Sequence, residues 1–305
     1  MIKKQAKQYL FICSLAIYLI IFACNRNTHK QNNKNLESIE NEDKVGTSNP
    51  IVLKFSNSLF SVPSPHEASI FIKKSGVKYN KNLLNSVDNI SNYTTSFKKA
   101  LNLGIYGSNL GYLNIYEQIP ESFKYFAAIK KLSGELSLNE SFDENIITCI
   151  ENNLDNKDSL LFYISKIYRN ANYHLNKNQR NNIGALVITG GFIESLYFLS
   201  KSATINGNYE IRNRIGDQKH PLDNLIDLLS PFYYQSDEYA DLIDKLVDLA
   251  YEFDGIIYNY IYEDPYIDTA NKLTIIKSES RIVISDYHLG IISEKIEKIR
   301  SAIIN

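Results

Sequence analysis

The first fifty residues divide the chain into parts that can and cannot contribute to a folded core. Residues 9–23 carry no charged side chain, and three lysines with no acidic residue come before them. A basic start followed by a short apolar run is typical of a secretory signal. Residues 25–50 are almost devoid of apolar side chains, so they cannot bury enough surface to fold. We therefore expect a packed domain only in residues 51–305.

The end of the apolar run resembles a bacterial lipobox. Ile21 is aliphatic, Ala23 is small, and Cys24 follows directly. In signals of this kind the cysteine thiol receives a diacylglycerol group, and the chain is cut before the cysteine. The resemblance implies a signal peptide at 1–23 and a disordered polar tether at 24–50 that begins with the lipidated Cys24. An uncleaved spanning helix needs about 20 apolar residues, and this run has about 15.

Composition narrows the partners of the processed chain. Removal of the signal lowers Lys+Arg from 33 to 30 and leaves Asp+Glu at 34, so the net charge is near −4. That balance, without any basic cluster, argues against nucleic-acid binding. Cys24 and Cys149 would be the remaining cysteines, and Cys149 lies in an apolar helical pattern that predicts a buried thiol. The expected address is the periplasmic face of the outer membrane, because Asn25 is not the Asp that retains some lipoproteins on the inner membrane.

Helical periodicity dominates residues 51–305. Pro65 opens a pattern that Gly76 closes, and a second apolar stripe follows the 3-4 spacing over 161–175. Two further stripes predict helices that begin after Ser236 and after Ser285. Their apolar positions are Leu242, Leu246, Leu249 and Phe253, and Ile292, Ile296, Ile299 and Ile303. The polar stretch 212–221 reads as a long loop.

The apolar segment 183–193 allows two interpretations. A strand that runs into a glycine turn would open a nucleotide-binding unit, but Gly190-Gly191 lacks the third glycine of that motif. A helix that is apolar on all sides is typical of a central buried helix. We favour the helix, in which the glycines let a neighbouring helix approach closely.

Strand signals are scarce. The two short β-branched runs Leu273–Ile276 and Arg281–Ile284 predict a small hairpin. The fold class that follows is all-α: a single multi-helix antiparallel bundle or array with one small β-hairpin near 273–284.

Three stretches together resemble a family of helical lipoproteins from Bacteroidetes to which no activity is assigned. They are YNKNLLN at 79–85, FKKALNLGIYGSNLGYLNIYEQ at 97–118 and GALVITGGFIESLYFLS at 184–200. The family often has Asp at the position of Asn109, so the resemblance implies no charged group there in this chain. It supports the helical fold and the envelope address, and it implies no reaction.

Glu194 is the side chain that most invites a binding role. It follows the apolar segment and is flanked by apolar residues, so its carboxylate should be desolvated and should seek a partner. One interpretation is a structural hydrogen bond to a tyrosine or a backbone amide. The other is a polar anchor in a ligand pocket rimmed by Tyr106, Asn109, Tyr112 and Tyr197.

The sequence contains none of the spacings that mark common catalytic or metal sites. No two histidines stand three or four residues apart, and there is no C-x-x-C, nucleophile elbow or P-loop. We therefore predict a non-enzymatic envelope lipoprotein without cofactor or metal, held to the membrane by the lipid on Cys24. It would act as an interaction or scaffold module with an envelope protein partner. The alternative is a periplasmic binder of a small ligand or glycan at a tyrosine-rich pocket near Glu194.

Overall fold

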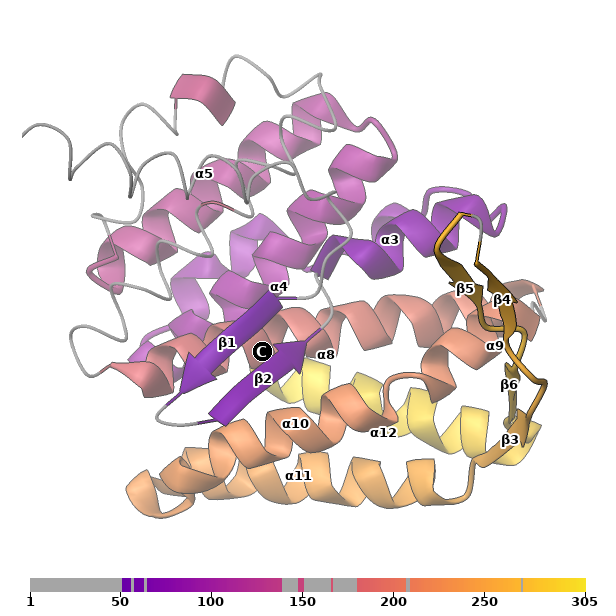
Figure 1. Ribbon diagram of the computed structural model, residues 1–305. Coiled ribbons are helices and arrows are strands. Elements are labelled where there is room, and N and C mark those ends of the chain that lie inside the picture. The colour runs from indigo at the N-terminus through magenta and orange to yellow at the C-terminus, as the bar shows by residue number, and fades with distance from the viewer. Residues whose placement is uncertain are drawn as a thin grey trace, which may run out of the picture. The chain divides into compact units, whose positions relative to one another are not determined.

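Helices make up most of the chain that the computed structural model describes. The described residues are 51–55, 58–62, 65–138, 148–150, 166, 180–206, 209–269 and 271–305. All of them belong to one compact unit, Ser48–Asn305 (Figure 1). The expected signal peptide, Cys24 and the tether lie outside the described residues, and so does nearly all of the stripe over 161–175. The all-α fold class is confirmed.

Two apolar helices form the centre of the domain. Helix α4 (Ser96–Ile115) is capped by Thr95, whose side chain accepts from the Lys98 N–H, and its residues 100–115 are all buried. Helix α8 (Asn181–Asn206) contains the segment 183–193, which is a buried helix as predicted. Its stretch Asn181–Ala203 is long and apolar enough to cross a membrane, but 89% of its most apolar window is buried inside the domain. It is a core helix.

Glycines bring the backbones of α4 and α8 into contact. A Cβ at Gly190 would lie 1.9 Å from the Leu101 carbonyl oxygen, and one at Gly104 would lie 1.9 Å from the Val187 carbonyl oxygen. The Ser108 hydroxyl donates to the Gly191 carbonyl at 3.0 Å across the same contact. The predicted close approach is therefore confirmed. Contacts advance together along both helices, so this pair runs in one direction, unlike the antiparallel neighbours that we expected.

Five further α-helices of the described chain pack around that pair. Helix α3 (Pro65–Lys74) ends before Gly76, whose φ of +80° suits glycine. Helices α5 (Ile119–Glu135), α10 (Lys219–Leu229), α11 (Asp237–Asp254) and α12 (Asp286–Ile304) complete the array. The apolar stripes predicted for α11 and α12 face the core. Short 3-10 helices are η1 (Lys81–Leu83), η2 (Val87–Asn92) and η4 (Ser230–Gln235).

The predicted polar loop over 212–221 is wrong. Helix α9 (Tyr209–Gly216) covers its first half, and two residues separate it from the start of α10. Ile211 and Ile215 are fully buried and anchor α9 on the core. Two isoleucines one helical turn apart were enough to order a segment whose other side chains are polar. Cys149 is half-buried, not buried as predicted.

The strands pair differently from the prediction. Strands β5 (Leu273–Ile275) and β6 (Glu279–Val283) lie where the two β-branched runs are, but they do not pair with each other. β6 pairs antiparallel with β3 (Ile257–Ile261), and β5 pairs antiparallel with β4 (Tyr266–Asp268). Together they form one long ribbon over residues 257–283, here called the β-arm (Figure 1).

A further pair of strands was not expected. β1 (Ile51–Phe55) and β2 (Ser58–Val62) form an antiparallel hairpin at the start of the described chain. The segment between the predicted tether and α3 is thus a strand pair and not a helix.

Candidate functional site

The five residues that the sequence singles out lie on the two central helices. Tyr106, Asn109 and Tyr112 belong to α4, and Glu194 and Tyr197 belong to α8. All five are buried, and Glu194 has no exposed surface. The contacts of these side chains decide whether the site is a pocket or part of the packed core.

Glu194 is held by Arg300 of α12, which the sequence analysis missed. Arg300 Nε donates to Glu194 Oε2 at 2.5 Å, and Nη2 donates to Oε1 at 2.9 Å. The guanidinium therefore binds the carboxylate in a bidentate manner. Nη2 also donates to the Leu83 carbonyl oxygen at 2.9 Å. The guanidinium carbon lies 4.2 Å from the centre of the Tyr197 ring, which covers its flat face.

The charges of this pair stabilise each other. Burial by itself disfavours a charged guanidinium, but the neighbouring Glu194 carboxylate outweighs that effect and raises the pKa of Arg300. Both side chains are withdrawn from water, at 0% exposure for Glu194 and 6% for Arg300. Each charge therefore depends on the other for the interactions that water no longer supplies.

Asn109 completes the surroundings of Glu194. Its Nδ2 donates to Glu194 Oε1 at 2.5 Å and to the Ile105 carbonyl at 2.8 Å. Its Oδ1 accepts from the backbone N–H of Asn85 at 2.8 Å. The amide thus links the carboxylate to the chain segment that precedes α4, and both of its ends are occupied.

The two tyrosines of α4 fasten that same segment. Tyr106 donates to the Ser86 carbonyl at 2.9 Å, and the Tyr112 hydroxyl accepts from the Asn80 N–H at 2.9 Å. Burial raises the pKa of both phenols, so they stay neutral. The Tyr112 ring packs 4.9 Å from that of Phe198. Both side chains therefore tie the segment down instead of rimming an opening.

Asn85 extends the polar centre towards the C-terminus. Its Nδ2 donates to the Tyr93 hydroxyl at 2.9 Å and to Asn102 Oδ1 at 3.2 Å. Asn102 Nδ2 in turn donates to the Ile303 carbonyl at 3.1 Å, and Tyr125 donates to the Asn85 carbonyl at 2.8 Å. We call the connected side chains Glu194, Arg300, Asn109, Asn85 and Asn102 the polar core.

This geometry argues against the predicted ligand pocket at Glu194. The carboxylate was expected either to bond a tyrosine or backbone amide or to anchor a ligand, and it instead pairs with Arg300 and Asn109. A ligand could reach it only by displacing the guanidinium. A signal for Arg300 was present in the sequence, because it interrupts an otherwise apolar stripe between Ile296 and Ile303.

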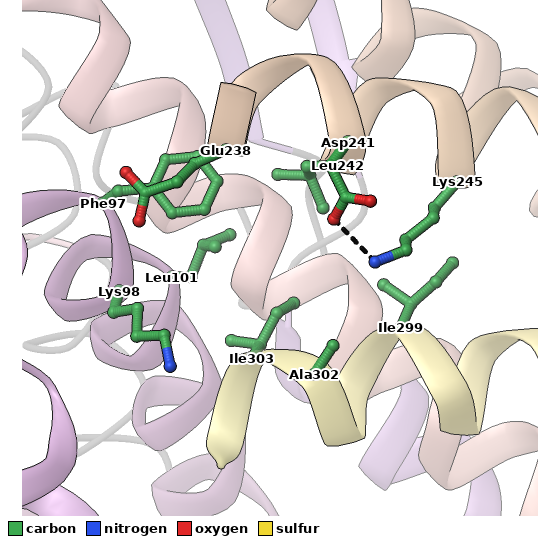
Figure 2. Close-up of a pocket in the computed structure, with 10 residues that line it drawn as sticks. All are labelled: Phe97, Lys98, Leu101, Glu238, Asp241, Leu242, Lys245, Ile299, Ala302 and Ile303. Atoms are coloured by element: carbon green, nitrogen blue, oxygen red, sulfur yellow. Dashed lines mark hydrogen bonds and ion pairs between the residues drawn. The ribbon is translucent and has the colours of Figure 1, made fainter. Parts of the chain in front are cut away.

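A shallow groove lies elsewhere, between α4, α11 and α12 (Figure 2). Its apolar floor is Leu101, Leu242, Ile299 and Ile303, and charged side chains that include the ion-paired Asp241 and Lys245 form its rim. Its volume is about 130 Å³, well below the roughly 300 Å³ at which ligand pockets begin. None of the five predicted site residues lines it.

His66 is a second buried polar group with unusual surroundings. It is 2% exposed, packs on Gly111 of α4, and neither ring nitrogen has a hydrogen-bond partner. Burial lowers its pKa to about 4, so the ring is neutral at pH 7.

Among the described residues, no group of three or more His, Cys, Asp or Glu side chains could hold a metal ion.

The β-arm carries the opposite arrangement, with large apolar side chains facing solvent. Eleven of them are each 40–73% exposed between residues 257 and 283. They are Ile257, Tyr258, Tyr260, Ile261, Tyr262, Tyr266, Ile267, Leu273, Ile275, Ile276 and Val283. At about 200 Å² for a large side chain, they expose about 1,200 Å² over the two faces of the β-arm. The average of about 600 Å² per face is the size of the largest apolar patches on ordinary monomers, and such patches are often functional.

The base of the β-arm is fixed to the helices by one face. Ile282 is buried against Gly216, and the Tyr258 hydroxyl donates to the Gly216 carbonyl at 2.8 Å. Because side chains alternate along a strand, Ile257 and Ile261 point to the opposite, outward face.

Comparisons with protein families, with curated proteins and with solved structures find no match to the chain.

Proposed function

We propose that the chain is a membrane-anchored lipoprotein of the bacterial envelope that acts as a non-enzymatic interaction or scaffold module. The apolar run before Cys24, the small Ala23 and the polar stretch to residue 50 support the anchor. We place it on the periplasmic face of the outer membrane, because Asn25 is not the Asp that retains some lipoproteins on the inner membrane.

The observation that carries the interaction role is the β-arm. An exposed ribbon of tyrosines and aliphatic residues with open strand edges invites association, and proteins normally cover or blunt such edges. The polar core supports a non-enzymatic role, because its charged and amide groups form hydrogen bonds with one another. The ligand- or glycan-binding alternative loses its anchor, since Glu194 is occupied by Arg300.

Metabolic labelling with a lipid precursor tests the anchor. The wild-type chain should incorporate label and fractionate with outer membranes, whereas Cys24→Ala should do neither. Cys149→Ala is the matched control and should label like the wild type. Equal labelling of Cys24→Ala would remove the lipoprotein from the proposal.

Photo-crosslinking in intact envelopes tests the interaction role. A benzophenone amino acid at Ile261, on the outward face of the β-arm, should give a protein adduct on irradiation. The same probe at Tyr234, which is 96% exposed on η4, should give none. Equal, background-level yields at both positions would contradict the proposal.

A further inference from the structure

We propose that the β-arm is a homodimerisation element, and that the outward face of one arm packs on the outward face of a second copy of this chain. The inference rests on the proposed function, because it names the partner of the same surface. It is argued from the distribution of charge along the ribbon, from its area, and from its turn.

The two halves of the β-arm carry opposite charge. The outgoing half, residues 257–269, has Glu263, Asp264 and Asp268 and no basic residue. The returning half, residues 271–283, has Lys272, Lys277 and Arg281, with Glu279 as its single acid. The ribbon is thus an acidic strand beside a basic one.

Acidic and basic residues also stand at matching levels along the ribbon. The Ser278 hydroxyl accepts from the Glu263 N–H at 3.1 Å and donates to the Glu263 carbonyl, which sets Glu263 beside Lys277. Asp268 is paired in register with Leu273, next to Lys272. The charge pattern therefore repeats at two levels, near the middle and near the turn.

A twofold axis parallel to the β-arm would exploit that pattern. Such an axis, midway between two ribbons, places the outgoing strand of one copy over the returning strand of the other at the same level. Acids then face bases at both levels, while the isoleucines of the two outward faces meet between them. Isologous contacts of this kind close at two copies, which a heterologous edge-to-edge pairing would not.

The area fits a dimer. The apolar surface of the β-arm averages about 600 Å² per face, and the polar side chains on each face add to the area that it can bury. A specific interface buries about 800 Å² per partner. A lipid surface fits less well as the partner, because the residues at the tip of the β-arm are polar. Asn271 donates to Asp268 through both its backbone N–H and its side chain, and Lys272 follows Asn271.

Two epitope tags on co-expressed full-length chains test the partner. With the benzophenone probe at Ile261, an adduct at twice the monomer mass should carry both tags. An adduct that carries one tag at another mass would overturn the homodimer but keep the interaction module. No adduct at all would overturn both proposals.

Charge reversal tests the packing. The variant Lys277→Glu makes acids face acids at the middle level of the β-arm, and Glu263→Lys makes bases face bases at that level. Each should lose the self-adduct by about tenfold or more when expressed alone, and a mixture of the two should restore the adduct between different tags. Two results would overturn the twofold arrangement. One is a self-adduct yield that the charge reversals leave unchanged, and the other is a mixture of the two variants that gives no adduct between different tags. Circular dichroism of each variant checks that it is folded.

Discussion

The polar core and the β-arm place the same kinds of residue in opposite positions. In the polar core the Glu194 carboxylate and the Arg300 guanidinium are buried. They form hydrogen bonds with each other, and Glu194 also accepts one from the Asn109 amide. In the β-arm, tyrosines and isoleucines stand in solvent although a core could have held them. Isolated exposed apolar residues are ordinary, but a contiguous set on one ribbon is not.

The comparison separates stability from function. In the polar core the buried side chains form hydrogen bonds with one another, and these bonds fix how α4, α8 and α12 meet. On the β-arm, Tyr258 and Tyr262 make hydrogen bonds within the chain, but Ile257, Ile261, Ile267 and Ile276 remain 40–73% exposed, and we infer that their use lies outside the chain. Substitutions in the polar core should therefore change unfolding, and substitutions on the β-arm should change association.

The largest effect is expected from Arg300→Met. It leaves the Glu194 carboxylate buried and without its cation, which costs about 3–5 kcal/mol of folding free energy. The midpoint of urea denaturation should fall accordingly. The double variant Glu194→Leu/Arg300→Met removes both charges and should recover most of the loss. A single variant as stable as the wild type would contradict the conclusion that the buried charges of Glu194 and Arg300 depend on each other.

The polar core also marks what the sequence could not supply. Glu194 was recognisable because it follows an apolar run, and Tyr197 lies one helical turn after it. Asn109 is 85 positions away and came from the stretch 97–118 that carries the resemblance. Arg300 is 106 positions away, and helical periodicity says only which face of α12 is buried. Which helix that face meets is settled by tertiary packing, so the sequence indicated a partner without identifying it.

The second largest effect is expected at the contact of α4 and α8. In Gly190→Ala the new methyl would lie 1.9 Å from the Leu101 carbonyl oxygen, which a backbone atom can relieve only if the helices separate. Overpacking of this kind costs about 1–3 kcal/mol, and we expect the upper end of that range.

Gly290→Ala is the matched control for this substitution. Gly290 is exposed on α12 and a Cβ there meets nothing within 4 Å. The change should stabilise the helix by about 0.5–1 kcal/mol. Opposite shifts of the two midpoints are the expected result, and equal shifts would contradict the close approach.

Elements with a clear period were predictable, and the β-arm shows why its pairing was not. The stripes of α11 and α12 followed from spacing, and the segment 183–193 was favoured as a buried helix because it is apolar on all sides. β5 and β6 were located correctly, but the shortest connection between them suggested a hairpin. They belong instead to one ribbon that turns at 269–272, and the interruptions at 262–265 and 276–278 hide that continuity.

His66 should give the domain an acid-sensitive stability. Its folded pKa of about 4 lies below the usual 6.5, so the unfolded chain takes up a proton first as the pH falls. The contribution is complete above pH 6.5 and declines until about pH 4, with a loss of about 2 kcal/mol at pH 5. Urea midpoints should show this, and His66→Leu should weaken the dependence. The control is Ile72→Val, on the same helix. It should lower the urea midpoint by the same amount at pH 7 and at pH 5, because it changes no titratable group.

The smallest effect on stability, and the clearest test of the comparison, is expected from Ile257→Ser/Val283→Ser. These two residues are paired in register on the outward face of the β-arm and are 58% and 46% exposed, so their loss should change the free energy of unfolding by no more than about 0.5 kcal/mol per site. Association should nevertheless fall at least tenfold in the two-tag experiment, because the apolar centre of the interface is gone. A matched change of exposed residues elsewhere, Tyr234→Ser, should leave both quantities unaltered. A variant that lost stability and kept association would mean that the β-arm belongs to the core and that its exposed residues serve folding.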